Sequence, residues 1–117
     1  HDALPISEAL KYLEICSNID NNETGAECAY LSTICLYNMQ QYDDAEEKVF
    51  FVSDKFSNYV EWTARSFIVL SDVYVAKDNI FQAKETLKSV IENYPDDDAN
   101  YEEIVSMAQE KLEVINN

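Results

Sequence analysis

Glycine and proline are nearly absent from this chain of 117 residues, which contains one Gly and two Pro. A sheet of many strands needs turns that are rich in these two residues, so their scarcity excludes most all-β folds. Residues that favour helices, such as Ala, Leu, Glu, Lys and Gln, are spread along the whole sequence instead. Because the length suits one domain with a modest core, we predict a single all-α domain over residues 1–117.

The chain also lacks the residues that most catalytic and metal sites need. Its only histidine is His1, so no catalytic triad, zinc site or imidazole base can be assembled inside the fold. Gly25 is its only glycine, which excludes a glycine-rich loop that could hold a phosphate group. We therefore expect a protein that is not an enzyme and that carries no cofactor and no metal ion.

Positive charge is scarce as well, with 8 Lys and Arg residues against 23 Asp and Glu residues and a formal net charge of -15. Such a chain repels phosphate backbones and anionic lipid surfaces, so nucleic acid is not an expected partner. No apolar run is as long as a membrane-spanning helix, which needs about 20 residues. Direct insertion into a membrane is therefore not expected either.

Three cysteines are present, at positions 16, 28 and 35. Cys28 and Cys35 fall on one predicted helix with a rise of about 10 Å between them, which is too far for a disulfide. Cys16 could reach either of them only if the tertiary fold happened to bring the two together. Because no CxxC motif or histidine partner accompanies them, we interpret all three as small buried apolar residues.

Apolar residues recur every three or four positions along the chain, which predicts helices. Six helical segments follow from this spacing, approximately 7–18, 23–38, 42–56, 60–76, 80–93 and 101–115. Capping pairs support three of the starts, namely Asn58 with Glu61, Asn79 with Gln82 and Asn100 with Glu103. The connections between segments are short and polar, so successive helices are expected to pack antiparallel as hairpins.

The sequence repeats itself at a shift of 38 residues, which aligns Ala45 with Ala83. The same shift aligns Ala26 with Ala64, Leu31 with Val69, Thr33 with Ser71, Leu36 with Tyr74, Tyr42 with Ile80, Val49 with Leu87, Val52 with Val90 and Phe56 with Tyr94. Two helices can cross closely only where their side chains are small, which explains Thr33 and Ser71 on the first helix of each unit. Each hairpin alone exposes an apolar face, so the hairpins are expected to stack.

These residues resemble the tetratricopeptide repeat (TPR) pattern, which the unit at 64–95 follows through Leu70, Ser71, Tyr74, Ala83, Leu87, Val90 and Pro95. The unit at 26–57 follows it less closely. The first helix matches the second helix of a unit at a shift of 36, through Ala9, Leu13 and Cys16. The stretch 61–95 is similar to the final full repeat of large bacterial repeat proteins, so the chain is expected to be a C-terminal fragment of one.

The resemblance implies a short right-handed superhelix of about six helices. Residues 1–20 would be the second helix of a truncated repeat, 23–57 and 60–95 would be repeats, and 99–117 would be a capping helix. Capping agrees with the composition of the last segment, which has apolar residues on one helix face and polar residues on the outer face.

The resemblance also implies a protein-interaction scaffold, with a peptide or protein partner in the concave groove. The groove residues would be Glu27, Tyr30, Ile34, Tyr37, Asn38, Trp62, Arg65, Ile68, Asp72, Val75 and Ala76. Family members that bind a terminal carboxylate use a Lys and Asn clamp, whereas this chain has apolar and acidic residues at those positions. An aromatic and acidic groove suits an apolar segment flanked by basic residues.

Three aromatic residues have two interpretations each. Trp62, the only tryptophan, could anchor a partner in the groove, but such a residue more often packs across the joint between two repeats. Tyr30 and Tyr37 lie on one helix face and suit either role equally. A binding groove would leave Tyr30, Ile34, Tyr37 and Ile68 exposed, whereas a structural segment would bury them.

The alternative function is assembly of a longer scaffold without any ligand of its own. The N-terminal helix would then present an apolar edge formed by Leu4, Ile6, Leu10, Tyr12 and Leu13, through which a homodimer could form. The compartment stays open. The family resemblance favours the bacterial periplasm or cell envelope, and three unpaired cysteines favour the cytoplasm.

Overall fold

The computed structural model describes residues 5–117, which form six helices joined by short connections. The helices are α1 (Ile6–Ile19), α2 (Glu23–Asn38), α3 (Tyr42–Lys55), α4 (Val60–Ala76), α5 (Ile80–Asn93) and α6 (Tyr101–Asn116). Each end lies within one residue of the end predicted from apolar periodicity. The described residues contain no strand, so the predicted all-α fold class is confirmed.

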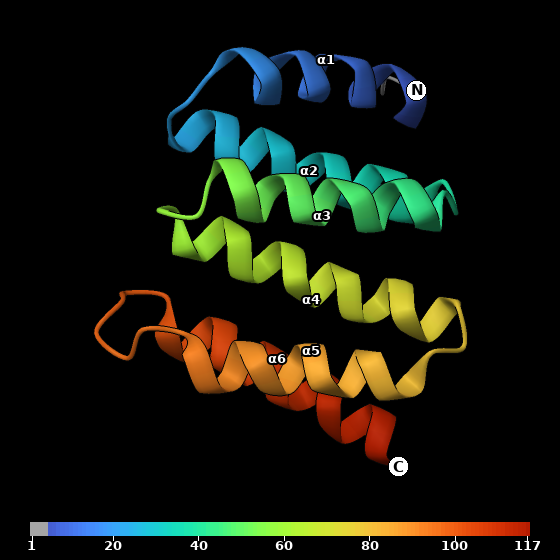
Figure 1. The fold of residues 1–117 in the computed structure, drawn as a ribbon, viewed down its shortest axis with the longest axis vertical. Coiled ribbons are helices and arrows are strands. Elements are labelled where there is room, and N and C mark those ends of the chain that lie inside the picture. Colours follow the sequence, from blue (N-terminus) through green and yellow to red (C-terminus); the bar gives the residue numbers. More distant parts are fainter. Residues whose placement is uncertain (1–4) are drawn as a thin grey trace.

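The helices stack as antiparallel hairpins along the long axis of the molecule, with α1 at one end and α6 near the other (Figure 1). The helices α2, α4 and α6 contact one another in sequence and form a continuous layer, which we call the inner layer. The helices α1, α3 and α5 lie on the other side, and each packs on inner-layer helices rather than on its odd-numbered neighbours. The odd-numbered helices are therefore separated by clefts.

The two turns inside the hairpins have the same geometry. Gln40 and Asp78 both adopt a left-handed conformation with φ of 61°. The amide of Gln41 donates a hydrogen bond of 2.9 Å to the Leu36 carbonyl, and the amide of Asn79 makes the corresponding bond of 2.7 Å. This pattern is the Schellman motif, in which the left-handed residue is usually glycine. The sequence repeat is therefore also a structural repeat.

The small residues predicted for the helix crossings are buried. Thr33, Ala45, Ser71 and Ala83 are all fully buried. The Thr33 and Ser71 hydroxyls each donate a hydrogen bond of 2.6 Å to the carbonyl three residues earlier. Each hydroxyl is thus satisfied within its own helix and leaves no unpaired polar group in the crossing.

The core consists of three apolar clusters, of which two lie among α2, α3 and α4 and the last lies among α4, α5 and α6. Their largest fully buried apolar side chains are Phe56, Leu70, Leu87 and Ile104. In the last cluster, Ile104, Val105 and Ala108 of α6 pack with Ala64 and Leu87 of the second hairpin. Helix α6 thereby covers the apolar face that this hairpin would otherwise expose.

Only one of the three predicted helix caps forms. Oδ1 of Asn79 accepts a hydrogen bond of 3.3 Å from the Gln82 amide. The predicted caps at Asn58 and Asn100 are wrong, because neither α4 nor α6 has a side-chain cap. The side-chain Nδ2 of Asn100 instead donates to Oε1 of Glu61 at 3.2 Å, a tertiary contact that the local pattern does not reveal.

Replacing Gln40 with glycine should stabilise the fold, because a side chain in the left-handed region costs roughly 1–2 kcal/mol that glycine avoids. Allowing for the greater flexibility of glycine in the unfolded chain, we expect Gln40→Gly to raise the free energy of unfolding by about 0.5–1 kcal/mol. Urea denaturation measures the change. Asp78→Gly should behave alike, and a loss of stability in both variants would contradict the assigned turn geometry.

Candidate functional site

The groove residues predicted from the sequence lie on α2 and α4, two of the three helices of the inner layer. Glu27 and Asn38 are exposed, and so are Val75 and Ala76 at the end of α4. The half-buried members are Tyr30, Ile34, Tyr37, Trp62, Arg65 and Asp72. We call this surface, together with the adjoining side of α6, the inner face.

Trp62 connects α2 with α4 on the inner face. Its ring lies 5.6 Å from the Tyr30 ring, measured between centroids, at an interplanar angle of 37°. Its indole Nε1 donates a hydrogen bond of 3.2 Å to Oε2 of Glu23. Trp62 therefore packs across the joint between two hairpins.

Arg65 extends this contact from α4 to α6. Its guanidinium Cζ lies 5.9 Å from the centre of the Trp62 ring. Nε donates to Glu61 at 2.9 Å, and Nη2 donates to Glu103 of α6 at 2.8 Å. Burial lowers the pKa of Arg65, but these two carboxylates outweigh burial and raise the pKa above its ordinary value. Arg65 is thus held in place by the chain itself.

A second bridge joins α4 and α6 further along the inner face. Nζ of Lys111 donates to both carboxylate oxygens of Asp72, at 3.0 and 3.1 Å. Tyr37 of α2 lies close enough to this ion pair for both charges to affect its pKa. Burial raises the pKa of Tyr37, Asp72 and Tyr42 add to the rise, and Lys111 opposes it. The ion pair therefore joins α4 to α6 close to Tyr37 of α2.

An open cleft of 410 Å³ lies between α4 and α6 beside this ion pair, and we call it the inner cleft. It is lined by Asp72, Val75, Glu110, Lys111, Val114 and Ile115. Val75 is 41% exposed and Val114 is 74% exposed. The cleft thus offers apolar side chains to solvent next to carboxylates, a combination typical of surfaces that bind other proteins.

Sequence reasoning placed Asp72 and Val75 on this surface but missed the contribution of α6. The sequence indicates only a polar outer face for that helix, which does not predict that Glu110 and Lys111 line a cleft. Val114 was the available signal, because a large apolar residue interrupts the polar face of the predicted cap. Only the packing of α6 against α4 shows that this residue lines a cleft.

None of the four residues whose exposure would favour a groove, Tyr30, Ile34, Tyr37 and Ile68, is exposed, and the groove placement of Ile68 is wrong. Its side chain is only 3% exposed, and it belongs to the same core cluster as Leu87 and Ile104. Helix α6 packs against this part of α4 and covers it. Ile68 therefore stabilises the fold and does not line the inner face.

An exposed apolar stripe runs along α1 at the N-terminal end of the stack. It consists of Tyr12, Ile15 and Ile19, which are 63%, 55% and 70% exposed. We call it the N-terminal stripe. Ile6 is also exposed, at 39%, whereas Leu10 and Leu13 are half-buried because α1 packs on α2. Leu4 lies outside the described residues.

The interpretation of all three cysteines as unpaired is wrong, because Cys16 and Cys28 form a disulfide. Their Cα atoms lie 6.0 Å apart, within the range that a disulfide spans. Antiparallel packing brings residues at similar distances from a turn together, and these two flank the turn between α1 and α2. Helix packing thus supplies the contact that spacing along one helix could not.

The only glycine explains how α1 and α2 approach so closely. A Cβ atom at Gly25 would overlap the backbone carbonyl of Asp20 at the end of α1. Gly25 is buried in the first turn of α2, next to the disulfide-bonded pair. Its role is therefore close packing between helices.

No protein-family model, curated protein or solved structure matches this chain at a significant level. Within residues 5–117, no group of three or more His, Cys, Asp or Glu side chains is placed to hold a metal ion. None of the described helices is both long and apolar enough to cross a membrane. The function must therefore be inferred from the surfaces described above.

Removing the disulfide should destabilise the protein. The two cysteines are separated by 12 residues, and closing a loop of this length stabilises the folded state by about 3 kcal/mol through the entropy of the unfolded chain. We expect Cys28→Ser to lower the free energy of unfolding by that amount in urea denaturation. Cys35→Ser, on the same helix but outside the disulfide, is the control. Added reductant should lower the stability of this variant as much as it lowers that of the parent.

Proposed function

We propose that this protein is a non-catalytic, TPR-like scaffold that binds a segment of a partner protein on its inner face. The repeated turns, the repeated small residues at the crossings and the continuous inner layer support the TPR-like interpretation. The observation that carries the binding function is the inner cleft, where Val75 and Val114 are exposed between carboxylates.

The partner chemistry follows from the charges around the inner cleft. Its only basic group, Lys111, is already paired with Asp72. Glu110 adds a carboxylate to the lining of the cleft, and Glu27 adds an exposed carboxylate elsewhere on the inner face. An apolar segment flanked by lysine or arginine would match the valines with its apolar residues and the carboxylates with its charges.

The residues of the inner cleft support binding rather than catalysis. Its lining contains no hydroxyl, thiol or imidazole group that could act as an activated nucleophile. Its apolar residues and its carboxylates suit recognition of a side chain or a backbone segment. We therefore propose that no reaction takes place there.

The disulfide favours an oxidising compartment, because disulfides form and persist in secreted and periplasmic proteins. Unpaired cysteines would favour the cytoplasm, but the disulfide removes that support. Together with the resemblance to bacterial repeat proteins, the disulfide supports a location in the periplasm or cell envelope.

The N-terminal stripe favours a second candidate function, which is assembly. Tyr12, Ile15 and Ile19 share one face of α1, and each exposes more than half of its surface. An apolar face of this kind is typical of a surface that another helix covers. A second copy of the chain or a further repeat would bury it.

Binding on the inner face can be tested with a synthetic peptide that has a valine and leucine core flanked by lysines. We expect saturable binding in calorimetry that weakens as salt is added, because the flanking charges are screened. Val114→Lys should weaken binding about tenfold or more, which corresponds to 1.4 kcal/mol, because it removes an apolar contact and repels the lysines.

Phe81→Lys is the matched control, because Phe81 is as exposed as Val114, at 71% against 74%, but lies on α5 outside the inner face. This variant should bind like the parent. Equal binding of a peptide flanked by glutamates, or an unchanged affinity in Val114→Lys, would contradict the proposed function.

Assembly can be tested by light scattering as a function of concentration. If the N-terminal stripe mediates assembly, the parent should form a dimer that Tyr12→Glu dissociates, because the charge cannot be buried in an apolar interface. Tyr37→Glu, on the inner face, should leave the dimer intact. Dissociation by Tyr37→Glu alone would mean that the inner face is itself the assembly surface, and a monomeric parent would exclude assembly through a second copy of the chain.

A further inference from the structure

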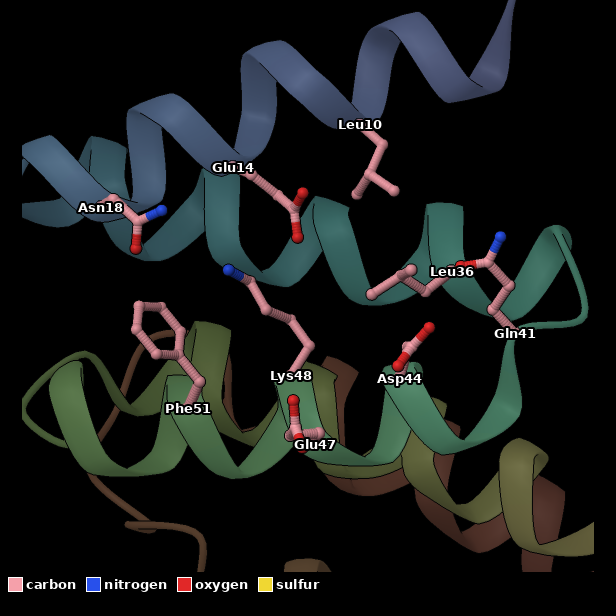
Figure 2. A pocket seen from close by; sticks show the side chains of 9 residues that line it. All are labelled: Leu10, Glu14, Asn18, Leu36, Gln41, Asp44, Glu47, Lys48 and Phe51. Carbon is pink, nitrogen blue, oxygen red and sulfur yellow. The ribbon is translucent and has the colours of Figure 1, made fainter.

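A second cleft, of 420 Å³, opens between α1 and α3 and shares no residue with the inner cleft (Figure 2). It is lined by Leu10, Glu14, Asn18, Leu36, Gln41, Asp44, Glu47, Lys48 and Phe51. Leu10 from α1 and Leu36 from α2 supply apolar contact surface, and Phe51 closes one end. We call it the outer cleft.

The outer cleft is a regular feature of the repeat. A corresponding cleft of 340 Å³ lies between α3 and α5. The repeat shift of 38 aligns five lining residues of the two clefts: Leu36 with Tyr74, Asp44 with Gln82, Glu47 with Glu85, Lys48 with Thr86 and Phe51 with Ser89. The spacing of the odd-numbered helices therefore produces the cavity, and the side chains determine what each cleft can bind.

The charges of the outer cleft are mostly negative. Glu14, Asp44 and Glu47 supply three carboxylates against the single cation of Lys48. Among residues 5–117, the side chains of Asp44 and Glu47 form none of the hydrogen bonds or ion pairs that join other residues of α3, such as Lys48 with Ser17. The cleft between α3 and α5 has a single carboxylate, Glu85, because Gln82 stands at the position that corresponds to Asp44.

Lys48 does not neutralise Asp44 and Glu47. Its Nζ donates to Oγ of Ser17 at 3.0 Å and lies 4.1 Å from the centre of the Phe51 ring. Burial lowers the pKa of Lys48, and the charge of Glu14 opposes that shift. Lys48 is therefore directed toward α1, as Figure 2 shows. Asp44 and Glu47 remain available on the α3 side of the cleft.

We propose that the outer cleft is a second docking site, which receives an arginine side chain from a partner protein. The aliphatic part of the arginine would pack on Leu10 and Leu36, while its guanidinium would meet Asp44 and Glu47. A guanidinium suits this place because its planar group of five donors can bond two carboxylates at once. Asp44 also lies in the first turn of α3, where the helix dipole stabilises its negative charge.

The test is calorimetric titration with the acetylated and amidated tripeptide Leu-Arg-Leu, alongside the same peptide with neutral citrulline in place of arginine. We expect the arginine peptide to bind and the citrulline peptide to bind at least tenfold more weakly. The double variant Asp44→Asn, Glu47→Gln should lower the affinity for the arginine peptide by a similar factor. In NMR spectra of isotope-labelled protein, the peptide should change the backbone amide chemical shifts of residues in α1 and α3.

Two controls separate this site from the others. Glu85→Gln makes the same chemical change in the cleft between α3 and α5, and it should leave the affinity unchanged. Val114→Lys alters the inner cleft and should also have no effect. If circular dichroism shows that the double variant does not fold, the single variant Glu47→Gln replaces it in the test, because Glu47 is exposed.

Three results would overturn the proposal. They are the absence of saturable binding at millimolar peptide, equal binding of the citrulline peptide, and an equal loss of affinity in Glu85→Gln or Val114→Lys.

Discussion

The close crossing of two helices inside each hairpin is the constraint on which the rest of the structure depends. Thr33 and Ala45 in the first hairpin, and Ser71 and Ala83 in the second, are fully buried, because only small side chains allow helix backbones to approach so closely. With the crossings set, α4 contacts both α2 and α6, while α1, α3 and α5 stay apart. One layer is consequently joined by side-chain bridges, and the other is divided by clefts.

The scarce basic residues mostly join helices to one another. Lys55 of α3 donates to the Ser17 and Asn18 carbonyls at the end of α1, and Lys77, which directly follows α4, pairs with Asp43 and Glu46 of α3. The other bridges are those of Arg65 and Lys111 to α6 and α4. Because the cations are used inside the molecule, the remaining carboxylates determine the character of both clefts. A protein with this surface should prefer cationic partners, at a strength that falls with added salt.

Most of the fold could be predicted from the sequence, because helices, hairpins and the repeat depend on local spacing. The candidate site could be predicted only in part. Asp72 and Val75, two of the predicted groove residues, line the inner cleft, and packing of Trp62 between two hairpins is one of its two sequence interpretations. Ile68 was misplaced because its burial depends on α6, which lies more than thirty residues further along the chain. Val114 and the outer cleft were missed for the same reason, since each cavity is lined from non-adjacent helices.

The sequence by itself determined the helical class, the ends of the helices, the antiparallel hairpins and the net negative charge, since all of these follow from residue type and short-range periodicity. The tertiary structure alone decided that Cys16 forms a disulfide with Cys28 and that Gly25 lies where no side chain fits. It also decided that the Asn100 side chain donates a hydrogen bond to Glu61 instead of capping its helix. These contacts depend on the distance and rotation between packed helices. That geometry is set by the sum of many side-chain contacts, which no single stretch of sequence contains.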